Sequence, residues 1–153
     1  MPIVLENPQS LTDLLGRDLA ATELFTVTQD QIQQFAEVTD DCQWIHVDPE
    51  RARNETSYGS TIAHGFLTLS LLSHFLREAI QIQSGARMSV NYGLNRVRFP
   101  SPVRAGAKIR AHFALRSLKE LADAMEAVFD VRIENQGFEK PCCVAEWVIR
   151  YYS

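Results

Sequence analysis

The stretch TIAHGFLTLSLLSHFLREAI, residues 61–80, decides the fold of this 153-residue chain. Its apolar residues surround most of a helical axis instead of forming one stripe: Phe66, Leu67, Leu69, Leu71, Leu72, Phe75, Leu76 and Ile80. A helix that is apolar on nearly every side is usually buried. The sequence therefore predicts a central helix of about eighteen residues that begins near His64 and is roughly 27 Å long.

The residues that follow change from helical to alternating periodicity. Apolar residues occupy every second position of 109–115, 125–133 and 145–151. This alternation indicates strands with one face toward water. Residues 119–123 and 135–137, which lie between these stretches, suit hairpin connections.

A longer strand, residues 88–99, is expected before these three. Its apolar parity changes near Asn95, which indicates a bulge or a shared surface. One buried helix and at least four antiparallel strands have an economical arrangement, in which the sheet curls around the helix. We therefore expect an α+β protein with the hot-dog fold, a single domain over residues 1–153 in which residues 1–18 are a peripheral N-terminal segment.

Charge and composition exclude several classes of partner. The formal net charge is −4, and lysine and arginine are scattered singly, so we expect neither a nucleic-acid-binding nor a membrane-binding face. The N-terminus lacks the pattern of a secretion signal. Three cysteines, two of them adjacent, fit neither a disulfide framework nor zinc-ligand spacing. These observations favour the cytoplasm.

The stretch VTDDCQWIHVDPERA, residues 38–52, contains the first candidate site. Thr28 and Gln31 form a capping-box pattern that predicts a helix from Gln29 to Val38, and Asp48-Pro49 is typical of a second helix start. Asp41 and His46 therefore lie in a loop between two helices. A carboxylate and an imidazole held together can position and deprotonate a water molecule.

The second candidate site is the start of the central helix at His64-Gly65. No Ser, Thr, Asp or Asn directly precedes it, although Thr61 is close enough to be a competing cap. The first amides of the helix are therefore expected to be free for a ligand oxygen.

Together these motifs resemble the MaoC-like dehydratase family, which includes the (R)-specific enoyl-CoA hydratases. The family pattern G-D-x-N-P-x-H corresponds to DDCQWIH, residues 40–46, and its aliphatic-A/V-H-G-M/F pattern corresponds to IAHGF, residues 62–66. Asp40 replaces the usual glycine and Gln43-Trp44 replaces Asn-Pro. The stretch NYGLNRVRFPSPVRAG, residues 91–106, is similar to the nodulation protein N-like subgroup, in which Gln-Trp is usual.

The resemblance implies reversible hydration of trans-2-enoyl-CoA to (R)-3-hydroxyacyl-CoA. Asp41 and His46 would be the catalytic residues that activate water, while Gly65, Ser73 and His64 would be oxyanion or substrate-binding residues. The substrate would be a coenzyme A or acyl carrier protein thioester, with no other cofactor and no metal. The resemblance also implies a homodimer with sites near its interface.

Other readings of these residues remain open. His64 is alternatively a structural histidine that hydrogen-bonds to the main chain. The Ser73 hydroxyl alternatively donates to the carbonyl four residues back. Arg96 and Arg98 either bind the phosphates of coenzyme A or are solvent-exposed surface residues. The central-helix residues Leu69, Leu72, Phe75 and Leu76 suit an acyl tunnel or plain core. Two other functions fit the same fold: an acyl-CoA thioesterase, and a non-catalytic acyl-CoA-binding module.

Overall fold

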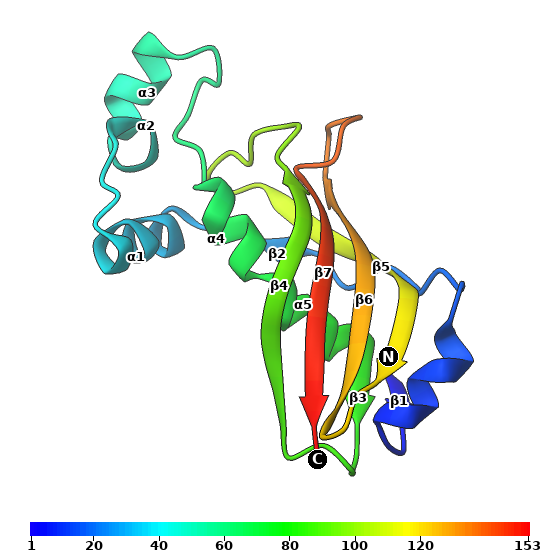
Figure 1. Ribbon diagram of the computed structural model, residues 1–153. Coiled ribbons are helices and arrows are strands. Elements are labelled where there is room, and N and C mark those ends of the chain that lie inside the picture. The colour runs from blue at the N-terminus through cyan, green and yellow to red at the C-terminus, as the bar shows by residue number, and fades with distance from the viewer.

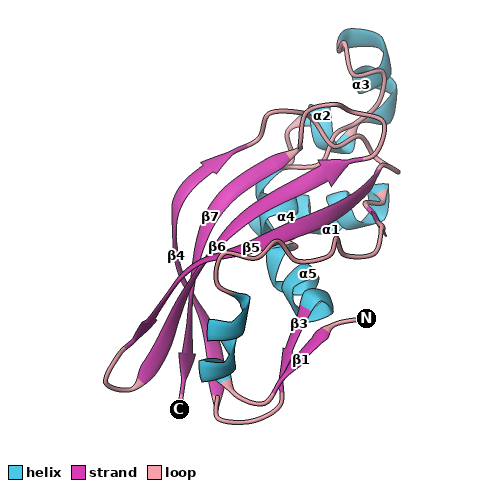
Figure 2. Cartoon of the chain, turned by 90° about the vertical axis from the view of Figure 1, so that its right-hand side faces the viewer, coloured by secondary structure: helices cyan, strands magenta, loops and turns pink.

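A five-stranded antiparallel sheet curls around two consecutive helices in the computed structural model, which describes residues 1–153 (Figures 1 and 2). The strand order is β2-β5-β6-β7-β4. The strands are β1 (Ile3–Leu5), β2 (Phe25–Thr26), β3 (Ile80–Ile82), β4 (Met88–Arg98), β5 (Lys108–Glu120), β6 (Ala124–Asn135) and β7 (Cys143–Tyr152). The helices are η1 (Pro8–Leu14), α1 (Gln29–Thr39), α2 (Trp44–Val47), α3 (Pro49–Glu55), α4 (Gly65–Ser70) and α5 (Leu72–Ala79).

The core lies between the sheet and the central helices. The apolar side chains that alternate along β5, β6 and β7 face it, and Phe113 and Phe129 are 1% and 0% exposed. Their rings meet edge to face, with 6.2 Å between centroids. Phe75 of α5 is also fully buried in this cluster. The predicted strands and the hot-dog fold are thus confirmed.

The central helix differs from the prediction of one continuous helix. It is divided into α4 and α5 at Leu71, whose amide is shared between the carbonyls of Leu67 and Thr68 at 3.2 Å each. This sharing tightens the helix locally, because one of the two bonds spans only three residues. The prediction of burial on nearly every side was also wrong at the N-terminal end, where Phe66 is 69% exposed. No helix in the structure combines the length and apolar character needed to span a membrane.

The helix ends around the first motif follow the predicted caps. Thr28 accepts a hydrogen bond from the Gln31 amide, and the Gln31 side chain accepts one from the Thr28 amide. At the start of α3, the Asp48 side chain accepts from the Arg51 amide at 3.0 Å. The one-turn helix α2 between these two helices was not predicted. The short helices α2 and α3 extend beyond one end of the sheet (Figure 1).

The N-terminal residues lie at the opposite end of the molecule from α3 (Figures 1 and 2). Strand β1 pairs in parallel with β3, which directly follows α5. In η1, Leu11 and Leu14 are 0% and 3% exposed and belong to the main core. The segment that we expected to be peripheral therefore closes this end of the core.

Strand β4 forms an edge of the sheet. It pairs with β7 on one side, and the register shifts between Asn91 and Gly93 and again between Leu94 and Arg96. These two irregularities agree with the bulge predicted near Asn95. Four large apolar side chains of the strand are at least 40% exposed: Met88, Val90, Tyr92 and Leu94.

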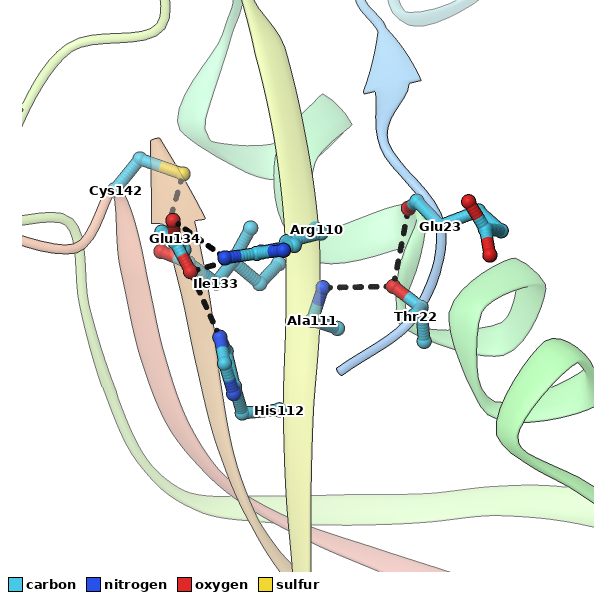
Figure 3. A network of polar contacts seen from close by, with 8 residues as sticks. All are labelled: Thr22, Glu23, Arg110, Ala111, His112, Ile133, Glu134 and Cys142. Carbon is cyan, nitrogen blue, oxygen red and sulfur yellow. Dashed lines mark hydrogen bonds and ion pairs between the residues drawn. The ribbon is translucent and has the colours of Figure 1, made fainter. Parts of the chain in front are cut away.

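An ion-pair network joins β5 to β6 on the polar face of the sheet. Figure 3 shows Arg110 and His112 turned toward Glu134, whose carboxylate accepts from Arg110 Nε at 2.9 Å and lies 2.9 Å from His112 Nε2. The hydrogen bond from Arg110, with that from His112, lowers the pKa of Glu134 to about 2. The network therefore stabilises the fold most when Glu134 is ionised.

We expect Glu134→Gln to lower the free energy of unfolding at pH 7 by up to about 1 kcal/mol, the usual range for a partly exposed pair. Because the folded pKa is depressed, this contribution is complete above the unfolded pKa and is lost as pH falls toward about 2. Urea unfolding of both proteins at pH 7 and pH 2 measures it, with the exposed Glu139→Gln as control. A difference that does not shrink at pH 2 would contradict the assignment.

Candidate active site

The end of α1 sets the position of Asp41. Asp40 adopts a left-handed conformation with φ 57° and ψ 27°, and the Asp41 amide donates to the Ala36 carbonyl at 3.0 Å. Glycine is favoured in this conformation, and aspartate is one of the few other residues that adopt it readily. The structure thus explains how Asp40 is accommodated where the family pattern has glycine.

His46 lies in α2 and is 7% exposed. Its Nδ1 lies 2.7 Å from the carbonyl oxygen of Ile62. A carbonyl only accepts hydrogen bonds, so Nδ1 carries the proton, and Nε2 of the neutral ring carries a lone pair. A second hydrogen bond holds this residue, because the side-chain amide of Gln29 donates to the His46 carbonyl at 2.8 Å.

His64 packs directly against His46. The two rings are stacked with 3.8 Å between centroids and 23° between planes. Nε2 of His64 lies 2.9 Å from the Asp41 carbonyl oxygen and 4.0 Å from the Asp41 carboxylate. Residues 41, 46 and 64 therefore form one cluster that joins the two sequence motifs.

The environment of His46 favours its neutral form. Burial is the largest influence and lowers the pKa of His46, and the neighbouring His64 lowers it further. The bond to Ile62 and the Asp41 carboxylate act in the opposite direction, and the net pKa is below the ordinary value of 6.5. At neutral pH the Nε2 lone pair is therefore available to accept a proton.

The tip of α4 begins one residue after the cluster, since Gly65 directly follows His64. The carbonyl of His64 accepts from the amides of Leu67 and Thr68, whereas the amides of Gly65 and Phe66 have no partner within the chain. Thr61 does not cap the helix, because its hydroxyl bonds to the Gln29 side chain. The two free amides can donate to a ligand oxygen.

A close contact with Phe99, which the sequence analysis did not predict, explains why position 65 is a glycine. A Cβ built on Gly65 would lie 3.0 Å from the ring of Phe99, which follows β4. The space beside the Cα atom is thus filled by an aromatic ring of the chain itself, and a larger residue would push this ring aside. No local pattern in the sequence signals this contact, because the two residues meet only in the folded chain.

Ser73 lies farther along the central helix, in α5, and lines a groove of about 650 Å³ between α5 and β4. Its hydroxyl makes no hydrogen bond within the chain; the backbone-bonded serine is instead Ser70, which donates to the Phe66 carbonyl at 2.6 Å. Leu76 lines the same groove. Leu69 and Leu72 line a smaller cavity that shares Ser73, whereas Phe75 belongs to the core.

The two arginines considered as phosphate ligands lie elsewhere. Arg96 lines a groove of about 670 Å³ together with residues of the polar sheet face, including His112 and Glu146. Arg98 donates to the Val97 carbonyl at 2.7 Å. Neither contacts the cluster of Asp41, His46 and His64.

A metal could be held only by that same cluster, in which each side chain offers a ligand atom within 4.8 Å of the others. One nitrogen of each histidine donates to a main-chain carbonyl and the other has no partner within the chain. Catalytic and metal-binding histidines share this arrangement. His74, the other histidine of the central helix, pairs with Glu78 at 3.4 Å.

A curled sheet around a central helix, with an acid and an imidazole beside the helix tip, defines a hot-dog protein of the hydratase type. Residues 11–136 match the MaoC like domain, and the chain belongs to the MaoC-like dehydratase family, whose nodulation protein N-like subgroup it resembles. It is a hydro-lyase enzyme.

Relatives of known name agree with this assignment. The chain is 40% identical to 3-hydroxyacyl-thioester dehydratase Z of Mycobacterium tuberculosis over 97% of each protein. It is 41% identical to nodulation protein N of Rhizobium leguminosarum bv. viciae over 91% of this chain and 89% of that one. Among solved structures, an (R)-hydratase from A. caviae involved in PHA biosynthesis has a TM-score of 0.70 and 27% identity, covering 88% of this chain and 94% of that one.

Proposed function

We propose that the protein is an (R)-specific enoyl-CoA hydratase, which interconverts trans-2-enoyl-CoA and (R)-3-hydroxyacyl-CoA. The observation that carries the proposal is the placement of Asp41 and the free Nε2 of His46 beside the unpartnered amides of α4. A water molecule and a polarised thioester can meet there. The names of the mycobacterial dehydratase and the A. caviae hydratase support the same chemistry.

In the proposed mechanism, the Asp41 carboxylate and His46 Nε2 hold the attacking water. The water oxygen bonds to C3 of the enoyl group while one of its protons passes to His46 Nε2, and the Asp41 carboxylate accepts a hydrogen bond from the same water. The electron pair of the double bond moves toward the thioester oxygen, and as it returns the protonated His46 ring gives its proton to C2. The lowered pKa of His46 keeps its ring neutral before this step.

The amide of Gly65 is proposed to stabilise the developing negative charge on the thioester oxygen. The Gly65 N–H is not used within the chain. One donor of this type typically contributes about 3 kcal/mol to transition-state stabilisation. The water site and the amide donor would thus act on opposite ends of the conjugated enoyl thioester.

The groove beside Ser73 is the proposed position of the acyl chain. It is lined by Leu76, Ile80 and Trp147 and holds about 650 Å³, which is enough for more than a short acyl group. The Ser73 hydroxyl is free to bind substrate there. The thioester carrier would be coenzyme A or acyl carrier protein, and the reaction needs no further cofactor. We propose a cytoplasmic location.

A spectrophotometric assay tests this function. Enoyl absorbance should fall when the protein is mixed with crotonyl-CoA or with longer enoyl-CoA substrates, and chiral analysis should identify the (R)-3-hydroxy product. Release of free thiol without the 3-hydroxy thioester would instead indicate a thioesterase. Saturable binding without turnover would indicate a non-catalytic acyl-CoA-binding module.

We further propose that β4 pairs with its counterpart in a second copy to form a homodimer. The strand presents eleven residues of unpaired edge, and exposed apolar edges of this kind favour pairing between chains.

Val90→Lys should therefore convert the protein to a monomer in light scattering, because a charge would be forced into the paired edge. Val38→Lys makes the same change at an apolar residue of α1 that is 80% exposed, and it should leave the assembly unchanged. If the unaltered protein is monomeric, or if both variants remain dimeric, the proposed interface is wrong.

A further inference from the structure

His64 joins the two halves of the candidate site. It directly precedes Gly65, and the residue is 2% exposed. Its Nε2 donates to the Asp41 carbonyl oxygen over 2.9 Å, and its ring stacks on His46 with 3.8 Å between centroids. The side chain of His64 therefore contacts both candidate catalytic residues, and its main chain is bonded to the candidate amide donor.

We propose that His64 is a positioning residue that holds Asp41, His46 and the Gly65 amide in one rigid frame. This inference rests on the proposed hydratase function and gives His64 a role other than substrate binding.

The first part of this role concerns Asp41, which lies in an exposed loop. Its carboxylate makes no hydrogen bond within the chain, and its side chain is 55% exposed. Its main chain, by contrast, is held on both sides: the amide donates to Ala36, and the carbonyl accepts from His64. Without His64, this loop would be held from one side only, by the Asp41 amide and the Cys42 thiol, which both bond to the Ala36 carbonyl.

The second part concerns His46. Stacking on His64 restricts rotation of the His46 ring, while the bond to Ile62 fixes its tautomer. The charged or titratable groups that face the ring are His64, which lowers the pKa of His46, and the Asp41 carboxylate, which raises it. Helix α1 contributes the neutral side chains of Gln29 to His46 and Phe35 to His64.

A matched pair of variants separates the two parts. The amide nitrogen of glutamine in His64→Gln can reach the position of Nε2 and keep the bond to Asp41, whereas the shorter side chain in His64→Asn cannot. We expect His64→Asn to lower kcat/KM by about a hundredfold, which is the scale of a misplacement of about 1 Å. His64→Gln should retain activity within about tenfold of the unaltered protein, because the acid remains held.

Both variants lack the stacked imidazole, so both should raise the pKa of His46. The acidic limb of the kcat/KM profile should therefore move to higher pH, and an NMR titration of the His46 ring in the free protein should show the same direction. His74→Gln, at another histidine of the central helix, should change neither measurement.

Equal activity of the two variants, together with an unmoved His46 titration, would overturn the inference. The NMR titration needs no substrate, so it distinguishes this failure from failure of the proposed function. A protein without hydratase activity whose His46 titration still moves in both variants would refute the function but retain the positioning of His46.

Discussion

Purified Asp41→Asn protein should hydrate crotonyl-CoA at least about a hundredfold more slowly than the unaltered protein, because the carboxylate that orients the attacking water is lost. The change preserves side-chain size, and the Asp41 carboxylate makes no hydrogen bond within the chain, so folding should be nearly unaffected. Initial rates of enoyl absorbance loss measure the effect, and thermal unfolding checks stability.

The adjacent residue supplies a matched control. Asp40→Asn removes a charge of the same sign, and asparagine also adopts the left-handed conformation found at this position. It should therefore retain nearly full activity. Near-normal turnover by Asp41→Asn, or an equal loss in both variants, would refute the role assigned to Asp41.

His46→Gln should reduce hydration to a similar extent, because it removes the proposed base. Glutamine does not reproduce Nδ1, so part of its effect could be structural. His46→Asn places an amide nitrogen where Nδ1 donates to the Ile62 carbonyl, and it should preserve this bond while lacking the lone pair of Nε2. Activity close to normal in His46→Asn would show that the imidazole is not the base.

Removal of the Gly65 amide should give the second large effect. Gly65→Pro deletes the N–H at the first position of α4, where proline is tolerated in helices. The preceding His64 has φ −57° and ψ 137°, which suits a residue before proline. We expect kcat to fall by about a hundredfold to a thousandfold, the usual effect of losing one oxyanion donor.

Crowding against Phe99 must be separated from loss of the donor. Gly65→Ala keeps the amide but places a Cβ 3.0 Å from the Phe99 ring, so it reports the steric part alone. Each Gly65 substitution should therefore also be made separately in a Phe99→Leu protein, in which the aromatic ring that crowds the new side chain is absent. If proline and alanine then give the same kcat, the Gly65 amide is not the oxyanion donor.

Local chemistry explains why much of the fold was predictable. Alternation along β5, β6 and β7 decides which side chains enter the core, and the Thr28 and Asp48 caps are formed by residues three apart in sequence. The predicted end of α1 and the Asp48-Pro49 cap also placed Asp41 and His46 in the connection between α1 and α3. These features depend on neighbours in the chain, so they can be read from it.

Features that depend on distant residues were not predictable. The exposure of Phe66 depends on which elements cover the tip of α4 in the folded chain, and the contact between Gly65 and Phe99 joins two elements far apart in sequence. The stacking of His46 on His64 likewise arises from the return of residues 61–64 alongside α2. Sequence reasoning identified His64 as a candidate, but only the structure shows which atoms it contacts.

All groups proposed to carry out the reaction come from the helices and loops between Asp41 and Gly65, while the charged face of the sheet lies outside that stretch. Substitutions on the polar sheet surface, such as changes to the Arg110–Glu134 pair, therefore do not alter the groups proposed to carry out the reaction. Substitutions confined to this polar face would leave the proposed reacting groups and the apolar groove beside Ser73 unchanged.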